Sequence, residues 1–400
     1  MFSLAFILVI LLVISLGLLL YIYVGYPLII VVLSKYRRQP IVKTGTLPTA
    51  TIVIPAHNEE AVINQKLDNI LSLDYPRELL QIIVCDDASD DRTAEIIRTY
   101  ASKGIQLSEG ARAGKVGALN RALGLATGQI YVITDADTIL NQNSLRELLV
   151  NFSDEKVGCV VAQTRMMSSN EQETSESGGL YWRYEALIRQ KESDLHSTVA
   201  ATGHLMALRR EIMQPIPSNV ILDDFYLAMM TISQGYRVIS EPKSVVWERP
   251  TNTMGDDINR RRRLTAGRYQ MVFMSREYLP KLSSLLRFQV ISHKFLRLAI
   301  PHLMILALLT NILLVALLPA LSLSPLANAM FIVLAILQGI FYGLALLGAV
   351  LSNTPLKKSK VFKIFMLPYF LCATNFASIA GLLWYFSGQH TVLWQQAKRQ

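Results

Sequence analysis

The sequence predicts an α/β domain with a mixed, mainly parallel sheet, placed between transmembrane helices at both ends of the chain. Long apolar segments occupy the two ends, and runs typical of buried strands alternate with helical patterns between them. With 52% hydrophobic and 17% charged residues, the chain is too apolar for an ordinary soluble protein and too charged for a pure membrane bundle. We therefore expect both kinds of structure in one chain.

The N-terminal segment, residues 1–34, is predicted to be a transmembrane anchor. No charged residue occurs in residues 1–33, a stretch long enough to cross a bilayer. A cleaved signal peptide is disfavoured, because the positive n-region is missing and the apolar run is too long. Three basic residues follow at the start of a linker, residues 35–48. The positive-inside rule therefore places this end of the segment in the cytoplasm.

The central block, residues 49–250, reads as one soluble domain. Apolar runs rich in β-branched residues predict buried strands at residues 50–56, 80–87, 129–137 and 157–166. Helical periodicity separates or follows these runs, over residues 59–73, 91–102, 115–126 and 143–152. Strands alternating with helices of this length form parallel β-α-β units.

The C-terminal part of the chain, like the N-terminal segment, has a sequence that predicts membrane attachment. Residues 251–298 are expected to form amphipathic helices at the membrane interface, and residues 299–388 about three further spans. Lysines between the second and third of these spans favour a cytoplasmic loop. The third span carries Pro368 and Asn375, and crossing would place the basic tail, residues 389–400, outside. A partly interfacial or re-entrant last segment is the alternative.

Pairs of acids end two of the predicted strands. Asp86 and Asp87 end one strand, and Asp135 and Asp137 flank a single alanine at the end of another. Open α/β sheets bind ligands at the carboxyl ends of their strands, and residues two apart in a strand face the same side. Oxygen ligands of this kind favour Mg²⁺ or Mn²⁺ bridged to substrate phosphates. A turn with helix-capping acids is the alternative for either pair.

Several other classes of site receive less support. The net charge of +9 arises largely from basic residues beside apolar segments and from the run at residues 260–263, which fits anionic lipid or a phosphorylated substrate better than nucleic acid. The segment 110–116 resembles a P-loop but has the wrong glycine spacing and no Ser or Thr after its lysine. The three cysteines lack metal-ligand spacing.

Taken in order, the motifs resemble a known family. They read VIPAHNEE, VCDDASDD, GKVGALN, TDADT, ATGHLMALRR and LDDFYLAMM, followed by an arginine cluster and membrane spans. This order is similar to that of the family-2, inverting membrane glycosyltransferases, which include cellulose, hyaluronan and poly-N-acetylglucosamine synthases. The resemblance covers about residues 49–270. It implies the GT-A, or nucleotide-diphospho-sugar transferase, fold.

The resemblance implies which residues bind the nucleotide of a sugar donor. Pro55, Ala56 and Glu59 match a first-strand motif whose loop lies near the nucleotide. Asp86 and Asp87 match acids that contact its base and ribose. UDP-sugars are the expected donors.

The resemblance also implies a site for the donor diphosphate. Lys115 matches a basic residue near the uracil or the phosphates, although a solvated lysine at a helix start is the alternative. Asp135 and Asp137 match the D-x-D pair, which holds a divalent metal, Mg²⁺ or Mn²⁺, on the diphosphate. Such a metal stabilises the leaving nucleoside diphosphate.

The segment LDDF matches the motif that supplies the catalytic base. By position Asp224 takes this role, with Asp223 in place of a more usual glutamate. A positioned carboxylate can remove the proton of an acceptor hydroxyl. A helix N-cap is the alternative for either aspartate. Gly203 and His204 match a strand and loop on the acceptor side, where His204 is structural or contacts the acceptor.

One motif departs from the family pattern. Processive members carry Gln-x-x-Arg-Trp on an interfacial helix, whereas this chain has Arg260, Arg263 and Leu264 at those positions. Arg263 retains a guanidinium suited to a diphosphate. The missing tryptophan argues for transfer of one or few sugars, and a basic patch on anionic lipid is the other interpretation of the run.

The sequence thus predicts a multi-pass enzyme of a bacterial cell membrane with its catalytic domain in the cytoplasm. It would transfer a sugar, with inversion, from a nucleotide sugar to a lipid-linked or saccharide acceptor in cell-surface or extracellular polysaccharide synthesis. Membrane lipids and an export or regulatory protein are the further expected partners, and nucleic acid is not. A processive polysaccharide synthase, a polyprenyl-phosphate sugar synthase and a non-catalytic nucleotide-binding scaffold remain open.

Overall fold

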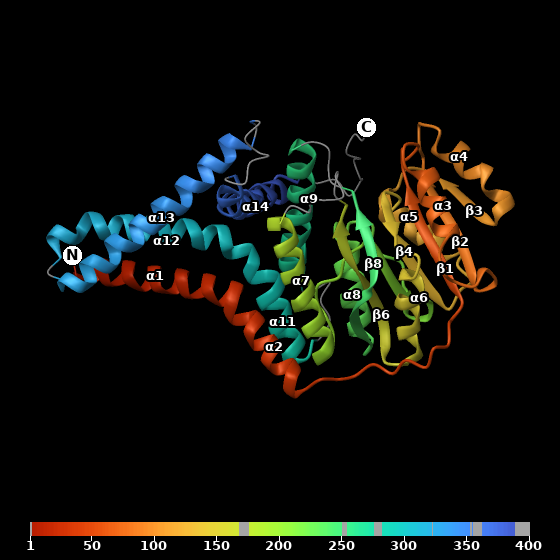
Figure 1. Ribbon diagram of the computed structural model, residues 1–400, viewed down its shortest axis with the longest axis horizontal. Helices are drawn as coiled ribbons and strands as arrows, with labels where there is room; N and C mark the ends of the chain where they lie inside the picture. Colours follow the sequence, from red (N-terminus) through yellow and green to blue (C-terminus); the bar gives the residue numbers. More distant parts are fainter. Residues whose placement is uncertain are drawn as a thin grey trace.

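A bundle of long helices and a sheet-centred domain make up the molecule (Figure 1). The computed structural model describes residues 2–167, 176–249, 254–275, 282–321, 323–352, 354 and 362–388. Helices α1 (Phe2–Leu20), α12 (Leu296–Leu317) and α13 (Pro325–Leu351) extend away from the sheet as a stalk. The predicted tail, residues 389–400, lies outside the described residues.

The described strands form one mixed sheet, in the order β3-β2-β1-β4-β7-β6-β8-β5. They are β1 (Ala50–Ala56), β2 (Leu80–Asp87), β3 (Ile105–Gly110), β4 (Ile130–Thr134), β5 (Thr138–Leu140), β6 (Val157–Met166), β7 (Leu205–Arg209) and β8 (Arg237–Glu248). Pairing is parallel from β3 through β4 and again between β6 and β8. The short strands β7 and β5 run antiparallel to their neighbours. The prediction of a mixed, mainly parallel sheet is confirmed.

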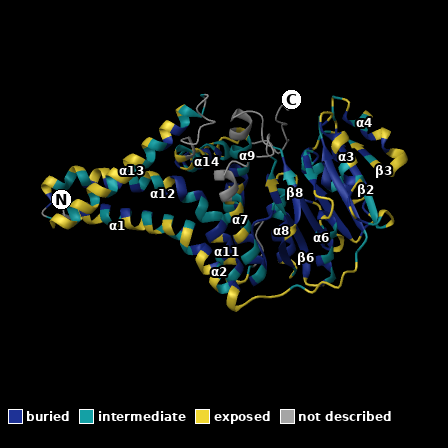
Figure 2. Cartoon of the chain, in the orientation of Figure 1, coloured by how far each residue is buried: buried dark blue, intermediate teal, exposed yellow. Residues whose placement is uncertain are grey.

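Helices cover both faces of the sheet and bury two apolar clusters (Figure 2). On one face lie α5 (Gly114–Leu123) and α8 (Asp223–Ser233). On the other lie α3 (Ile63–Leu71), α4 (Thr93–Thr99) and α6 (Ser144–Leu149). With both faces covered, the central strands are apolar throughout, which is why the runs that became β1, β2 and β6 carry a clear signal in the sequence.

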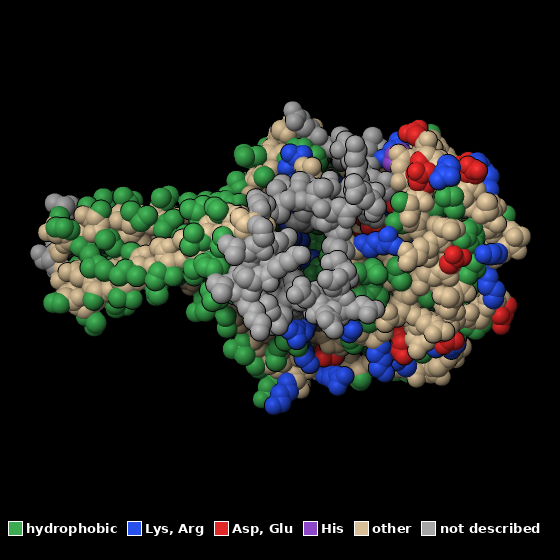
Figure 3. Space-filling model, turned by 45° about the horizontal axis from the view of Figure 1, so that its top comes forward, with side chains coloured by type: hydrophobic (Ala, Val, Ile, Leu, Met, Phe, Trp, Pro, Cys, Tyr) green, Lys and Arg blue, Asp and Glu red, His purple; other side chains and the backbone are tan. Residues whose placement is uncertain are grey.

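Within the described residues, four helical segments, called the membrane helices below, are long and apolar enough to cross a membrane. They span Ser3–Tyr36, Ser284–Ala320, Pro325–Leu351 and Ile364–Phe386, and their apolar side chains cover the stalk (Figure 3). The second begins at Ser284 rather than at residue 299, because α11 (Ser284–Gln289) continues through a π-helical turn, η6 (Val290–Phe295), into α12.

Helices α7 (Glu176–Leu195) and α9 (Met254–Phe273) lie between the sheet and the membrane helices (Figure 1). Helix α9 packs against α14 (Phe362–Phe386), which is one continuous helix despite its internal proline. Two arginines of the basic run take part, since Arg261 lies over the Phe370 ring and Arg262 over the Trp384 ring of α14. Half of the basic run is therefore used in helix packing.

Gly381 permits the close approach of α14 to α9, so we expect Gly381→Leu to destabilise the protein. A Cβ at this position would lie 2.7 Å from the Thr265 Cβ and 3.0 Å from the Arg262 carbonyl oxygen. Overpacking of this kind costs about 1–3 kcal/mol, seen as a lower thermal unfolding temperature in detergent. Gly339→Leu is the matched control, because a Cβ there meets nothing within 4 Å. Equal unfolding temperatures for the two variants would contradict the packing argument.

Candidate active site

The turn between β4 and β5 carries Asp135 and Asp137. Strand β4 ends at Thr134, and β5 begins at Thr138. The two carboxylates therefore do not share one face of a strand, because the strand geometry does not persist past Thr134. A tight turn from β4, which pairs with β1 and β7, to β5, which pairs with β8, presents them instead, at the sheet edge where β1 and β2 also end.

A buried lysine that the sequence reading did not single out supports this turn from below. The Lys66 side chain on α3 is completely buried, and its ammonium donates to Thr134 Oγ1 at 2.8 Å. It also donates to the carbonyl oxygen and the hydroxyl of Thr138, at 2.9 and 3.1 Å. Burial lowers the pKa of Lys66 to about 7, although Asp135 and Asp137 act to raise it. The lysine thus joins both ends of the turn and places positive charge behind its acids.

We expect Lys66→Met to weaken the use of divalent metal. The substitution keeps most of the side-chain volume but leaves the buried oxygens of Thr134 and Thr138 without this donor, at a cost of about 1–3 kcal/mol. The turn then holds its two acids less firmly, and the Mn²⁺ concentration at half-maximal activity rises about tenfold. Lys156→Met, at an exposed lysine, is the control. An unchanged Mn²⁺ dependence would show that Lys66 acts on stability alone.

Lys115 connects the turn with the start of α8. Its ammonium lies 2.8 Å from Asp135 Oδ1 and 3.3 Å from Asp223 Oδ2. Burial acts to lower the pKa of Lys115, but these carboxylates outweigh it and raise that pKa above its ordinary value. Burial alone would raise the pKa of Asp135, but Lys115 and His204 outweigh this effect and lower it. Lys115 is therefore an ion-paired residue, and the solvated-lysine interpretation is wrong.

The two candidate base residues open α8. The N-cap position is occupied by Leu222, without a side-chain cap, so Asp223 and Asp224 lie in the first turn rather than at the cap. Asp224 Oδ1 accepts a hydrogen bond from the Phe225 N–H at 2.7 Å. Burial and the neighbouring Asp223 raise the pKa of Asp224 above that of an ordinary aspartate. A carboxylate with a raised pKa is suited to accepting a proton.

Gly203 lies close to both Lys115 and Asp224. A Cβ there would lie 3.2 Å from the Lys115 ammonium and 3.7 Å from the Asp224 Cβ. The absence of a side chain at this position therefore lets the backbone approach both groups.

An ion cluster on the other side of the turn holds His204. Glu248, the last residue of β8, is buried and pairs with Arg260 and, at 3.4 Å, with His204 Nε2. Burial would raise the pKa of Glu248, but the two cations lower it to about 2. Thr164 Oγ1 contacts His204 Nδ1 at 3.0 Å. Sequence reasoning missed Glu248, although an acid that ends a strand at the carboxyl edge was an available signal.

Arg263 and Leu264 occupy the other two positions that align with the Gln-x-x-Arg-Trp motif, and their surroundings differ. Asp223 and Asp135 interact electrostatically with the Arg263 guanidinium and act to raise its pKa. Burial acts in the opposite direction and outweighs them, so the pKa of Arg263 lies below its ordinary value. Leu264 packs against the apolar cluster beneath α5 and α8. Arg263 thus faces the site, while Leu264 serves the core.

The predicted nucleotide-binding residues lie at the ends of β1 and β2. Pro55 and Ala56 close β1, where Ala56 pairs with Asp86. Asp86 accepts hydrogen bonds from Ser89.

Two buried acids anchor the loops around that edge. Asp87 is fully buried, pairs with Arg112, and accepts from the N–H groups of Ala113 and Gly114, at 2.7 and 2.8 Å. It therefore fixes the loop that leads into Lys115. Glu59 is buried as well, and its backbone N–H donates to Thr93 Oγ1 at 2.7 Å.

The acids of the turn fit a divalent cation that a substrate also coordinates. Throughout the described residues, no group of three or more His, Cys, Asp or Glu residues is placed to hold a metal. Mg²⁺ and similar ions are commonly held by one or two carboxylates together with substrate phosphates. Asp135 and Asp137 provide such a pair of oxygen ligands, and Lys115 and Arg263 provide positive charge beside them.

Comparisons with known proteins show which proteins the chain is similar to. Residues 51–216 match the family model described as Glycosyl transferase family 2. The chain is 28% identical over 231 residues to a probable glycosyltransferase, YdaM, of Bacillus subtilis, a match covering 52% of each protein. It is 34% identical over 146 residues to a beta-monoglucosyldiacylglycerol synthase of Trichormus variabilis, covering 35% of this chain and 31% of that one.

A third relative is the poly-beta-1,6-N-acetyl-D-glucosamine synthase of Staphylococcus aureus, 24% identical over 248 residues, with 59% of this chain and 58% of that one covered. The matches thus span about a third to three fifths of these curated relatives.

One solved structure matches nearly the whole chain. The mannosyltransferase PcManGT from Pyrobaculum calidifontis, solved with GDP-Man and Mn²⁺, is 26% identical and superposes with a TM-score of 0.70. The match covers 95% of this chain and 100% of that one, so the likeness extends over the sheet domain and the membrane helices. The predicted GT-A fold is confirmed.

Proposed function

We propose that this chain, whose residues 51–216 form a glycosyl transferase family 2 domain, transfers a hexose from a nucleotide sugar to a lipid-linked acceptor at the membrane surface. The observation that carries the proposal is the position of Lys115. Its ammonium lies within 3.3 Å of carboxylates on both the D-x-D turn and the start of α8. The two halves of a transfer site, for the leaving group and for the base, are thereby adjacent.

On the donor side, Asp135 and Asp137 would hold a divalent cation against the diphosphate. Such a cation neutralises the charge that develops on the leaving nucleoside diphosphate. Lys115 and Arg263 are permanent cations, and they stabilise the same developing charge. The loops after β1 and β2, with Pro55, Ala56, Asp86 and Asp87, provide the surface for the nucleotide.

On the acceptor side, Asp224 takes the proton. The acceptor hydroxyl oxygen attacks the anomeric carbon, the bond from that carbon to the diphosphate oxygen breaks, and the hydroxyl proton moves to the Asp224 carboxylate. A single displacement of this kind inverts the anomeric centre and needs no sugar–enzyme intermediate. Gly203 lies next to this carboxylate and has no side chain that would cover it.

The membrane helices determine the class of acceptor in this proposal. The four apolar helices would anchor the chain in a bacterial cell membrane with the sheet domain on the cytoplasmic side, in agreement with the basic residues after the first span. A lipid-linked acceptor then reaches the site from the bilayer without leaving it. A relative named for a glucosyldiacylglycerol supports an acceptor with a lipid anchor.

A donor panel tests the proposal. The full chain, purified in detergent, is incubated with Mn²⁺, lipid extract and each of UDP-glucose, UDP-N-acetylglucosamine, UDP-galactose and GDP-mannose, and nucleoside diphosphate release is measured. We expect one donor to be preferred and a single-sugar or short-chain glycolipid to appear by mass spectrometry. Saturable nucleotide binding without turnover of any donor would support a non-catalytic scaffold instead.

A processive polysaccharide synthase is the second candidate, because one relative is named as a polymer synthase. The position of Leu264 in the apolar core speaks against it, since no aromatic ring is available there to support a growing sugar chain. Product length decides between the two. Long polymer from the purified enzyme would favour the processive synthase.

A further inference from the structure

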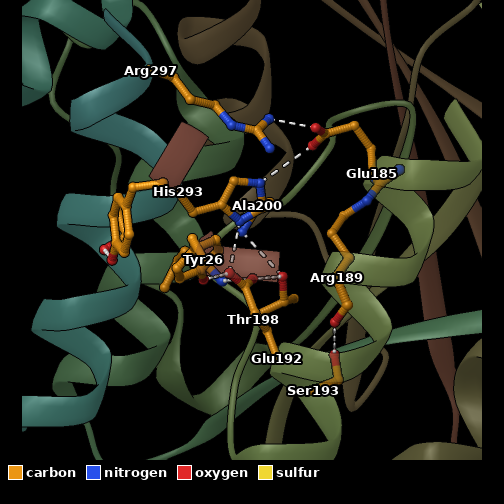
Figure 4. Close-up of polar contacts among 12 residues, drawn as sticks. Tyr26, Glu185, Arg189, Glu192, Ser193, Thr198, Ala200, His293 and Arg297 are labelled. Atoms are coloured by element: carbon orange, nitrogen blue, oxygen red, sulfur yellow. Dashed lines mark hydrogen bonds and ion pairs between the residues drawn. The ribbon is translucent and has the colours of Figure 1, made fainter. Parts of the chain in front are cut away.

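A buried polar cluster joins the sheet domain to the membrane helices (Figure 4). Helix α7 contributes Glu185 and Glu192, the π-helical turn η6 contributes His293, and α12 contributes Arg297. His293 Nδ1 lies 2.7 Å from Glu192 and His293 Nε2 lies 3.3 Å from Glu185, so each ring nitrogen faces a carboxylate. Arg297 pairs with Glu185 as well. The cluster therefore places one histidine and one arginine beside two acids.

The N-terminal span and the sheet domain complete this cluster. The Tyr26 hydroxyl, on helix α2 (Tyr26–Tyr36), donates to Glu192, and the Thr198 hydroxyl donates to the other oxygen of Glu192 at 2.8 Å. Burial alone would raise the pKa of Glu192, but His293 and the hydrogen bonds from Tyr26 and Thr198 lower it. Three other segments of the chain, α2, α7 and the loop with Thr198, thus meet at the cluster that holds η6.

This anchoring determines the direction of the next residue, Lys294. His293 and Arg297 are four residues apart and both point to α7, so Lys294 lies on a different side of the helix. Its ammonium lies 5.7 Å from the centre of the Phe225 ring on α8. Phe225 directly follows Asp224, and Lys294 and Asp224 interact electrostatically. π-Helical turns of this kind often occur at functional sites.

We infer that Lys294 is a positioning residue of the active site, whose ammonium holds the Asp224 carboxylate in the ionised form that accepts the acceptor proton. This inference rests on the proposed function, since it assigns a role in the same transfer reaction. It adds a cation that comes from a membrane helix, about seventy residues beyond Asp224 in the sequence. The structure thus assigns part of the catalytic machinery to the membrane-embedded half of the chain.

The charges around Lys294 and Asp224 support the positioning role of Lys294. Asp223 acts on Asp224 against ionisation, whereas Lys115, Arg263 and Lys294 act in its favour. Lys115 is already shared between Asp135 and Asp223.

Besides Asp224, Lys294 interacts electrostatically with the exposed Arg268 on α9 and with Glu185 and Glu192 on α7. Among the described residues it makes a cation–π contact rather than a close ion pair. Its charge therefore remains available to Asp224.

The pH dependence of turnover tests the inference. Asp224 must be ionised to act, so activity rises as the pH increases through its pKa. Removing a neighbouring cation raises that pKa further and moves the acidic limb to higher pH. In Lys294→Met we expect turnover on the acidic limb to fall about tenfold, with the plateau at high pH within about twofold of the wild-type value. Lys294→Arg should keep the wild-type profile, as should the control Arg287→Met, at an exposed cation on α11.

A second measurement does not depend on turnover. Thermal unfolding in detergent is compared for Lys294→Met, Asp224→Asn and the double variant at neutral pH. We expect the losses in unfolding temperature to be non-additive, because removing either charge already abolishes the interaction. Additive losses, or an activity loss equal at every pH, would overturn the inference. If no donor is turned over but the losses are non-additive, the proposed function fails and the electrostatic interaction between Lys294 and Asp224 stands.

Discussion

Asp224→Asn is expected to abolish sugar transfer while leaving nucleotide-sugar binding unchanged. The asparagine side chain occupies the same space at the start of α8 but cannot accept the proton of an acceptor hydroxyl. Loss of a positioned general base lowers turnover by about 10²–10⁴-fold. Donor binding depends on the other end of the site, where Lys115 and Asp135 lie, so the dissociation constant for the nucleotide sugar should change by less than about threefold. Nucleoside diphosphate release and isothermal titration measure the two quantities.

The neighbouring acid supplies the comparison for this experiment. Asp223 pairs with Lys115 at 3.3 Å, so Asp223→Asn should disturb the lysine and weaken donor binding while retaining measurable turnover. If Asp223→Asn were the inactive variant and Asp224→Asn remained active, the base assignment would have to be exchanged. Thermal unfolding of both proteins checks that each is folded.

Removal of divalent metal is expected to lower turnover about as strongly as Asp224→Asn does. Without a cation on Asp135 and Asp137, the leaving diphosphate develops its charge against Lys115 and Arg263 alone. Lewis-acid stabilisation of several kcal/mol is then lost, which corresponds to at least about a thousandfold in turnover. Chelation by EDTA followed by titration with Mg²⁺ or Mn²⁺ measures this loss and its recovery.

The variant Asp137→Asn tests whether the turn between β4 and β5 holds the divalent metal. We expect a higher Mn²⁺ concentration at half-maximal activity, with partial recovery of turnover at saturating metal. Asp90→Asn is the control, because Asp90 is an exposed acid near the same sheet edge. Full activity of the EDTA-treated wild-type enzyme would refute metal dependence, whatever the behaviour of the variants.

Much of the sheet could be predicted from the sequence, and the reasons for the exceptions are physical. Strands β1, β2 and β6 are buried on both faces, so their apolar runs give their bounds directly. Strand β3 lies at the edge of the sheet, with buried and exposed residues interspersed, and was not predicted. Strand β8 was missed because Pro242 and Lys243 interrupt its apolar pattern at a register shift.

The candidate site divides in a similar way. The order of the acidic motifs pointed to Asp135, Asp137 and Asp224, because acids that end buried strands or open a helix are visible locally. Their mutual arrangement through Lys115 depends on tertiary packing, which no local pattern encodes. Lys294 was beyond reach for the same reason, since its relation to Asp224 is set by a buried ion cluster on a different helix.

The apolar core described above includes residues that belong to the membrane segments. Met271 on α9, and Leu286 and Val290 at the beginning of the second span, are buried in the same cluster as the side chains of α5 and α8. During synthesis the sheet is complete once β8 has emerged, but this core is not. The core of the sheet domain is therefore complete only after residues of the second apolar segment have been synthesised and packed against it, so the sheet domain and the start of this segment form one folding unit.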